Sequence, residues 1–164
     1  MQDDIEIVEV PQGERARLEQ VLDESFEGWY LRHSKKTLAE VETVRAAKVS
    51  GEAVGLIMLK TLEGGAGYIF YVAVAKAHRG TGVAGLLVRD ALRLFWAAGL
   101  TDAFASVEED NLPSERLFAA EGFTRTGLAE VSRKYGLLHA LNMYRMMVVV
   151  PGEILLHRTL EKVT

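Results

Sequence analysis

The spacing of hydrophobic residues predicts a strand and two helices in the first quarter of the chain. Residues 5–10 alternate imperfectly between apolar and charged side chains, which predicts a strand. Over 14–26 the apolar residues recur at helical spacing and predict a helix. Thr37 and Glu40 have the spacing of a capping box, so we expect a second short helix over 37–44.

The next apolar runs predict a hairpin and a buried strand. Ser50-Gly51 separates the runs 44–49 and 52–60, and Ser-Gly between β-rich segments is typical of a hairpin turn. Residues 68–74, Tyr-Ile-Phe-Tyr-Val-Ala-Val, form an unbroken aromatic and β-branched run. Such a run is typical of a central strand that is covered on both faces.

Further along the chain the pattern alternates between helix and strand. A glycine-rich turn over 79–85 leads into a helix with an apolar stripe, which Gly99 ends. Residues 103–107 predict the next strand. The helix after it begins near Pro113 and ends at Gly122.

The C-terminal part is less regular. Phe123 opens another predicted strand, and 143–150 is the last long apolar run, which we interpret as a strand that carries Tyr144. The tail from Gly152 has the pattern of a short amphipathic helix. Residues 126–139 contain no motif with a chemical meaning.

The composition excludes several classes of function. The 164 residues are 49% hydrophobic and 26% charged, as in a soluble globular protein, and the length suits a single domain over 1–164. The formal net charge of −4 argues against nucleic-acid binding. The sequence has no cysteine, which excludes thiolate metal sites and cysteine nucleophiles. The acidic start and the lack of a long apolar run indicate a cytoplasmic protein that does not bind membranes.

The turn over 79–85 has the chemistry of an anion site. Glycines let backbone N–H groups approach a ligand closely, and the helix that follows presents its positive N-terminal end. Together these features suit a phosphate or a pyrophosphate, and two ligand classes carry one. The residues of the turn are Arg79, Gly80, Thr81, Gly82, Val83, Ala84 and Gly85.

A nicotinamide or flavin dinucleotide is the first of these classes. Gly80, Gly82 and Gly85 satisfy the G-x-G-x-x-G pattern, and an acidic run over 108–110 lies past the next strand. Two observations count against this ligand. Residues 75–79 separate the strand from the first glycine, and too little chain remains to complete a doubly wound sheet.

Coenzyme A is the second class, and two motifs carry a resemblance to a family that binds it. Arg79, Gly82 and Ala84 fit the pattern Arg/Gln-x-x-Gly-x-Gly/Ala after a strand. The second motif is Asn-x-x-Ala-x-x-Leu-Tyr-x-x-x-Gly-Phe, and the chain has Asn111, Ser114, Leu117, Phe118, Gly122 and Phe123 at those places. With both motifs at this separation, residues 68–123 resemble the core of the GNAT N-acetyltransferase superfamily.

The resemblance implies an α/β (α+β) domain with a mixed central sheet. It implies about six to seven strands, a splay between the fourth and fifth strands, and about four flanking helices. Acetyl-CoA would be the cosubstrate, with its pantetheine arm in the splay against the backbone of Val72 and Val74, and the Val72 amide would polarise the thioester carbonyl. The other implied cofactor contacts are the turn 79–85, Asn111, Ser114 and Phe118. Asn111 and Ser114 suit helix capping equally well.

Two departures from the family leave the proton transfers open. Phe118 stands where many members have a tyrosine that protonates the departing CoA thiolate, and phenylalanine cannot donate a proton. Tyr68 stands where some members have a glutamate that acts as the base. The remaining candidates, acting directly or through water, are Glu108, Glu109, Tyr71 and Tyr144.

The expected activity is transfer of an acetyl group from acetyl-CoA to a primary amine by direct attack in a ternary complex. The alternatives are a CoA-binding sensor or weak pseudoenzyme of the same fold, and a dinucleotide-binding module. We expect a small-molecule or protein amine as acceptor, in a pocket shaped by the first helices and by 126–139. The acidic run 108–110 favours a cationic amine. A homodimer through an edge strand is a further expectation, and the histidine spacing suggests no metal site.

Overall fold

The computed structural model describes residues 4–161 and has an α/β fold with a seven-stranded sheet in the order β1-β2-β3-β4-β5-β7-β6. The expected mixed sheet is confirmed, with six α-helices in the described residues where about four were expected. The strands are β1 (Ile5–Glu9), β2 (Thr43–Val49), β3 (Glu52–Leu62), β4 (Ala66–Val74), β5 (Asp102–Glu108), β6 (Thr124–Thr126) and β7 (Glu153–Thr159). The helices are α1 (Glu19–Ser25), α2 (Gly28–Glu40), α3 (Val83–Ala97), α4 (Leu112–Ala120), α5 (Leu128–Tyr135) and α6 (Leu137–Met147), with short 3-10 helices η1 (Gln12–Leu18) and η2 (Lys76–His78).

The chain divides into two compact units, which are described separately. The first unit comprises the chain up to Lys60 together with Phe70–Ala91, and the second comprises Thr61–Ile69 together with the chain from Leu92 onward. The expectation of one domain over 1–164 stays a prediction. Within residues 4–161, no helix combines the length and the apolar character that crossing a membrane requires. The cytoplasmic location also stays a prediction.

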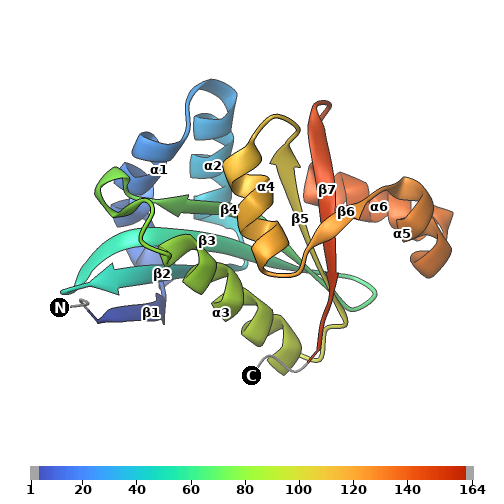
Figure 1. The fold of residues 1–164 in the computed structure, drawn as a ribbon, viewed down its shortest axis with the longest axis horizontal. Coiled ribbons are helices and arrows are strands. Elements are labelled where there is room, and N and C mark those ends of the chain that lie inside the picture. Colours follow the sequence, from blue (N-terminus) through green and yellow to red (C-terminus); the bar gives the residue numbers. More distant parts are fainter. Residues whose placement is uncertain (1–3, 162–164) are drawn as a thin grey trace. The chain divides into compact units, whose positions relative to one another are not determined.

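Strands β1, β2 and β3 form the antiparallel part of the first unit (Figure 1). The β2–β3 ladder ends at the pair Val49↔Glu52, so Ser50 and Gly51 alone form the turn. Both turn residues have positive φ, 51° at Ser50 and 82° at Gly51, as a type I′ hairpin turn requires. The hairpin predicted from Ser-Gly is confirmed.

Different helices cover the two faces of these strands within the first unit. Leu22 of α1, Leu38 of α2 and Leu56 of β3 belong to one buried cluster, so α1 and α2 cover that face. Neighbouring residues of a strand point to opposite faces, and Gly55 therefore faces the other side. A Cβ at Gly55 would lie 3.1 Å from Cγ1 of Val83, which shows how closely the start of α3 approaches β3.

The second helix differs from the prediction. Thr37 and Glu40 lie in the last turn of α2 instead of opening a helix, and Thr37 Oγ1 donates to the His33 carbonyl at 2.8 Å. The residues after this helix form β2, so the predicted helix over 37–44 is wrong. Few aliphatic residues occur over 28–36, and periodicity therefore gives no sign of the helix that packing of Leu38 holds in place.

Strand β5 is central to the second unit. It pairs in parallel with the first part of β4, from Ala66↔Asp102 to Ile69↔Ala105, and antiparallel with β7 over its whole length. Strand β7 also pairs with β6 and so lies between β5 and β6. The predicted amphipathic helix from Gly152 is therefore wrong, because partners far away in the sequence draw this segment into the sheet.

The segment before β7 is helical. Helices α5 and α6 follow each other and lie side by side (Figure 1, orange). Tyr144 lies on α6, so its predicted place on a strand is wrong. The apolar run that suggested a strand includes Met143 and Met147, which are buried one helical turn apart. Periodicity alone does not distinguish a short buried strand from a buried helical turn.

A buried carboxylate ties β5 to other elements of the second unit. Asp102 Oδ1 lies 2.6 Å from His157 Nε2 of β7, and Oδ2 accepts hydrogen bonds from Tyr135 Oη at 2.6 Å and Thr101 Oγ1 at 2.9 Å. Lys134 of α5 forms an ion pair with the same oxygen. Burial alone would raise the pKa of Asp102, but these hydrogen bonds outweigh it and lower the pKa to about 2. Asp102 is thus a buried charged residue that links β5 to β7 and α5 within the second unit.

We expect Asp102→Asn to lower the free energy of unfolding at pH 7 by about 3 kcal/mol, because it removes a buried charge that has several partners. The matched control is Asp23→Asn, whose carboxylate makes an exposed pair with Lys35, and little change is expected there. Urea unfolding measures both. An Asp102→Asn protein as stable as the wild type would contradict the stabilising role of the Asp102 carboxylate.

The lowered pKa of Asp102 also predicts that the free energy of unfolding depends on pH. Since folding lowers the pKa of Asp102, its contribution is complete above its unfolded pKa of about 3.9 and is lost as the pH falls toward 2. In urea unfolding between about pH 5 and pH 2.5, the difference between wild type and Asp102→Asn should therefore shrink. A constant difference over this range would contradict the pKa shift.

Candidate functional site

The second half of β4 carries the residues expected to meet the thioester. Val72 and Val74 lie beyond Ile69↔Ala105, the last pair in the parallel register of β4 with β5. Both are partly buried and belong to the first unit. Ala75 N donates to Val54 O at 2.8 Å and fixes the end of the strand against β3.

The glycine turn has the geometry of an anion site. Gly80 and Gly82 have φ of 76° and 87°, a conformation that glycine adopts without strain. A Cβ at either residue would meet no atom within 4 Å, so the backbone is open on that side. Helix α3 begins just after, where Leu86 N donates to Gly82 O at 3.2 Å. The preceding amides of the first turn have no partner within the helix, and they are therefore available to bind phosphate oxygens.

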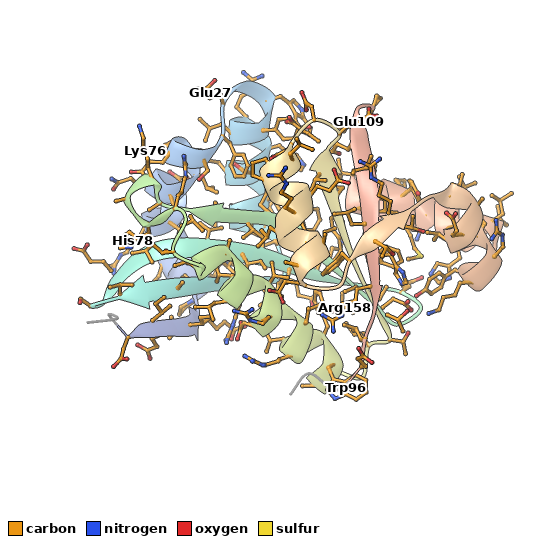
Figure 2. The ribbon with its side chains drawn as sticks, in the orientation of Figure 1. Glu27, Lys76, His78, Trp96, Glu109 and Arg158 are labelled. Carbon is orange, nitrogen blue, oxygen red and sulfur yellow. The ribbon has the colours of Figure 1, made fainter. Side chains whose placement is uncertain are left out.

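The Arg79 side chain folds back and donates hydrogen bonds to backbone carbonyls near the turn. Its Nη2 donates to Glu24 O at 2.5 Å and its Nε to Val74 O at 3.3 Å. The Glu24 carboxylate accepts from Lys76 N at 2.8 Å, so the end of α1 holds both ends of the segment that carries Lys76 and His78 in Figure 2. Thr81 Oγ1 donates to His78 O inside the turn. Nothing in the sequence pattern pointed to Glu24.

In the second unit, Asn111 and Phe118 have clear structural roles, and Ser114 contributes its backbone amide to the helix cap. Asn111 Oδ1 accepts from Ser114 N at 3.2 Å and caps α4, with Pro113 in the first turn. The capping role considered for Asn111 is confirmed. Phe118 is buried, and its ring packs edge-on against Phe123 with centroids 5.2 Å apart. It therefore belongs to the core of the second unit.

The carboxylates considered as bases lie at the end of β5. Glu108 is partly buried and pairs in the ladder with Glu153. Glu109 is exposed, as Figure 2 shows at the tip beyond β5, and its N–H donates to Gly152 O at 2.9 Å. The backbone of both residues is thus fixed by the segment that leads into β7.

Tyr144 and Tyr68, both in the second unit, are poor bases as phenols. Burial raises the pKa of the Tyr144 phenol, and the nearby Glu130 carboxylate raises it further. Tyr68 is fully buried, with its hydroxyl 2.6 Å from Ser106 Oγ, and burial raises its pKa far above the usual value. Tyr68 therefore stays protonated and does not replace a catalytic glutamate.

The comparisons with known proteins agree with the glycine turn at the start of α3. A family model described as the acetyltransferase (GNAT) family matches residues 6–123. The chain belongs to this family. The predicted family and the acetyltransferase class are thereby confirmed. Acetyl-CoA, the expected cosubstrate, is bound in a solved GNAT acetyltransferase. No curated protein matches the sequence.

Solved structures of GNAT acetyltransferases share the fold over almost the whole chain. One is a GNAT family acetyltransferase from Elizabethkingia anophelis with acetyl-CoA bound, with a TM-score of 0.71, 17% identity, and coverage of 97% of this chain and 100% of that one. A second is the PaiA N-acetyltransferase from Thermoplasma acidophilum in complex with coenzyme A. It has a TM-score of 0.72 and 13% identity, and the match covers 95% of this chain and 99% of that one. A third is the ribosomal-protein-S18-alanine N-acetyltransferase from Escherichia coli. It has a TM-score of 0.72 and 11% identity, and the match covers 98% of this chain and 97% of that one. At these identities the similarity shows the fold alone.

In this GNAT acetyltransferase, Tyr71, one of the candidate bases, belongs to an aromatic group whose other members the sequence did not point to. His33 Nδ1 of α2 lies 2.6 Å from Tyr71 Oη of β4. The Trp29 ring stacks on the imidazole, with centroids 4.7 Å apart and planes 7° apart, and Phe26 packs edge-on against Tyr71 at 5.2 Å. The spacing of Trp29 and His33, four residues apart, would have signalled a shared helix face had the helix over 28–40 been predicted.

We expect Gly82→Asp to raise the Kd for CoA by about 100-fold, or about 2.7 kcal/mol. The substitution adds a negative charge and a side chain where the amides of the turn face open space. Gly82→Ala adds bulk without charge and should have a smaller effect. Isothermal titration with CoA measures all three proteins.

The matched control is Gly51→Asp in the β2–β3 hairpin. Gly51 also has positive φ, 82°, and an open Cβ direction, but it adjoins no helix N-terminus. Its replacement should leave CoA affinity unchanged while it imposes the same backbone strain. A folded Gly82→Asp protein with the wild-type Kd for CoA would overturn the assignment of the turn.

Proposed function

We propose that the protein transfers the acetyl group of acetyl-CoA to a primary amine by direct attack in a ternary complex. The observation that carries this proposal is the open turn at Gly80 and Gly82, which leads into the N-terminus of α3. The backbone of Val72 and Val74 would bind the pantetheine arm. The further cofactor contacts that we propose are Arg79, Gly80, Thr81, Gly82, Val83, Ala84, Gly85, Asn111, Ser114 and Phe118.

Acetyl-CoA supplies an activated thioester, and the chain's own groups would stabilise the charge that develops on it. The Val72 amide donates a hydrogen bond to the carbonyl oxygen as the amine attacks. A fixed backbone donor of this kind costs no reorganisation during the reaction and is usually a large part of the catalytic effect. The amides at the start of α3 hold the pyrophosphate and so fix the register of the thioester along β4.

Phe118 leaves the reaction without a tyrosine as acid, and this loss is tolerable for chemical reasons. The leaving group is a thiolate, and a thiol with a pKa near ~8.5 departs largely unprotonated at neutral pH. An acid therefore contributes much less here than it does for an alkoxide or an amine leaving group. Water or the hydroxyls of Ser114 and Tyr144 remain as proton sources.

The acceptor is proposed to be a cationic amine, because Glu108, Glu109 and Asp110 form an acidic run after β5. Such a run attracts ammonium groups at long range, and salt screens this attraction. The acceptor itself must lose its proton to attack, since an alkylammonium has a pKa near ~10.

The function is tested by release of free CoA thiol from acetyl-CoA over a panel of amines. The panel comprises spermidine, tyramine, lysine and a peptide with a free N-terminal alanine, each against a no-amine reaction. We expect turnover above hydrolysis for at least one amine, with a KM that rises with ionic strength for a cationic one. CoA binding without transfer to any amine would replace the proposal with a CoA sensor.

A thermal-shift comparison of CoA with NAD⁺ and NADP⁺ separates the remaining alternative. Stabilisation by CoA alone is expected from the turn geometry. Stabilisation by a nicotinamide dinucleotide in place of CoA would favour the dinucleotide module.

We expect Phe118→Tyr to change kcat less than about threefold. Phe118 is 5% exposed and packs on Phe123, so the added hydroxyl would have to fit into a packed core. Steady-state turnover of wild type and variant with the same amine measures the effect. A wild type that is silent while the tyrosine variant turns over well would mark a disabled active site.

A further inference from the structure

A histidine and a tyrosine from different elements of the first unit share one short contact. His33 is on α2 and Tyr71 is on β4, 38 positions apart in the sequence, and His33 Nδ1 lies 2.6 Å from Tyr71 Oη. The rings have centroids 5.8 Å apart. Both residues are partly buried, so the contact is shielded from water without being sealed from it.

Tyr71 directly precedes Val72, the residue whose amide the proposed reaction uses. Side chains alternate along a strand, so Tyr71 and Ala73 share one face of β4. Ala73 belongs to the buried cluster with Leu22 of α1 and Leu38 of α2, which places Tyr71 on the face covered by α1 and α2. Helix α3, with the phosphate turn at its start, packs on the opposite face of the first unit. Within the first unit, the pair therefore lies on the face of β4 opposite to the turn proposed to hold the phosphates, and both side chains are partly exposed.

The surroundings of His33 keep its imidazole neutral and oriented. Burial lowers the pKa of His33, and Lys36 on the same helix lowers it further. Trp29 stacks flat on the ring, Phe26 at the end of α1 contributes an apolar edge beside Tyr71, and from β4 the facing titratable group is Tyr71 itself. A neutral imidazole held in this way can accept a proton at Nδ1.

We propose that Tyr71 and His33 form the proton-accepting pair for the amine substrate. In this step the neutral amine nitrogen forms its bond to the acetyl carbon, the carbonyl π electrons move to the oxygen, and the Tyr71 oxygen takes the proton that the nitrogen loses. Tyr71 passes its own hydroxyl proton to His33 Nδ1 at the same time, and the resulting imidazolium releases a proton to water. The carbonyl then forms again as the C–S bond breaks and CoA leaves as its thiolate. Tyr71 is the catalytic residue of the pair and His33 is a positioning and relay residue. This inference rests on the proposed function.

The test compares Tyr71→Phe and His33→Asn with the wild type on the best amine of the panel. Asparagine keeps a hydrogen-bonding atom close to the place of Nδ1 but does not titrate, so it preserves the position of Tyr71 without accepting a proton. We expect kcat/KM to fall about 100-fold in each variant, within the usual range of general base catalysis, with CoA affinity unchanged. Tyr30→Phe, which removes a phenol hydroxyl from the same helix, should retain wild-type turnover.

The pH profile distinguishes a proton acceptor from a merely structural residue. Because burial and Lys36 lower the pKa of His33, wild-type kcat/KM should fall only at acidic pH, as His33 becomes protonated, and this acid limb should be absent in His33→Asn. In His33→Ala, added imidazole should restore activity in proportion to its unprotonated form. Unaltered kcat and pH profile in Tyr71→Phe and His33→Asn would overturn the pair alone, and loss confined to Glu108→Gln or Glu109→Gln would assign the base to that glutamate at the end of β5.

An unstable variant does not blur this outcome. Thermal unfolding and CoA titration of each variant separate misfolding from a loss of chemistry. Absence of turnover in the wild type over the whole panel would overturn the proposed function together with the pair, whereas wild-type turnover that survives both variants would overturn the pair only.

Discussion

The buried carboxylate of Asp102 holds the elements of the second unit together. It fastens the first residue of β5 to α5 through Lys134 and to β7 through His157, at the same end where Ala66↔Asp102 begins the parallel ladder with β4. A parallel strand pair held firmly at one end can stop pairing further along without coming apart. The register does stop at Ile69↔Ala105, before Val72 and Val74, and the proposed thioester contacts lie on the part of β4 beyond it.

In the first unit, hydrogen bonds between side chains and backbone atoms order the start of the glycine turn. The guanidinium of Arg79 donates to two carbonyls, and Glu24 accepts from Lys76 N. A positive side chain near a pyrophosphate is easily explained as a charge contact, yet this geometry assigns Arg79 first to holding the strand end and the turn together. In the proposed complex the anion would meet amides that are fixed before it arrives, so little conformational entropy would remain to be lost on binding.

Local signals revealed the turns and caps, and distant pairing decided the rest. Ser50-Gly51, the glycines of the turn and the Asn111 cap were predictable because each conformation depends on a few neighbouring residues. Strand β7 was missed because its place between β5 and β6 depends on partners that the local sequence does not reveal. In the sequence, His157 of β7 and the buried Asp102 that it contacts likewise looked like ordinary surface residues. Helix α2 was misplaced for want of an aliphatic stripe, and with it the link between His33 and Tyr71 was lost.

The departures at positions 68 and 118 become coherent once the two proton transfers are considered separately. A thiolate leaves without help, so a buried phenylalanine at 118 removes a group that the chemistry needs least. An ammonium cannot attack, so the acceptor side does need a base, and the phenol at 68 is locked against Ser106 inside the core. The demand therefore falls on a group near the acetyl carbon that can pass a proton outward. In the proposed reaction Tyr71, which precedes Val72 and whose hydroxyl contacts the partly buried imidazole of His33, would meet that demand without any carboxylate on β4.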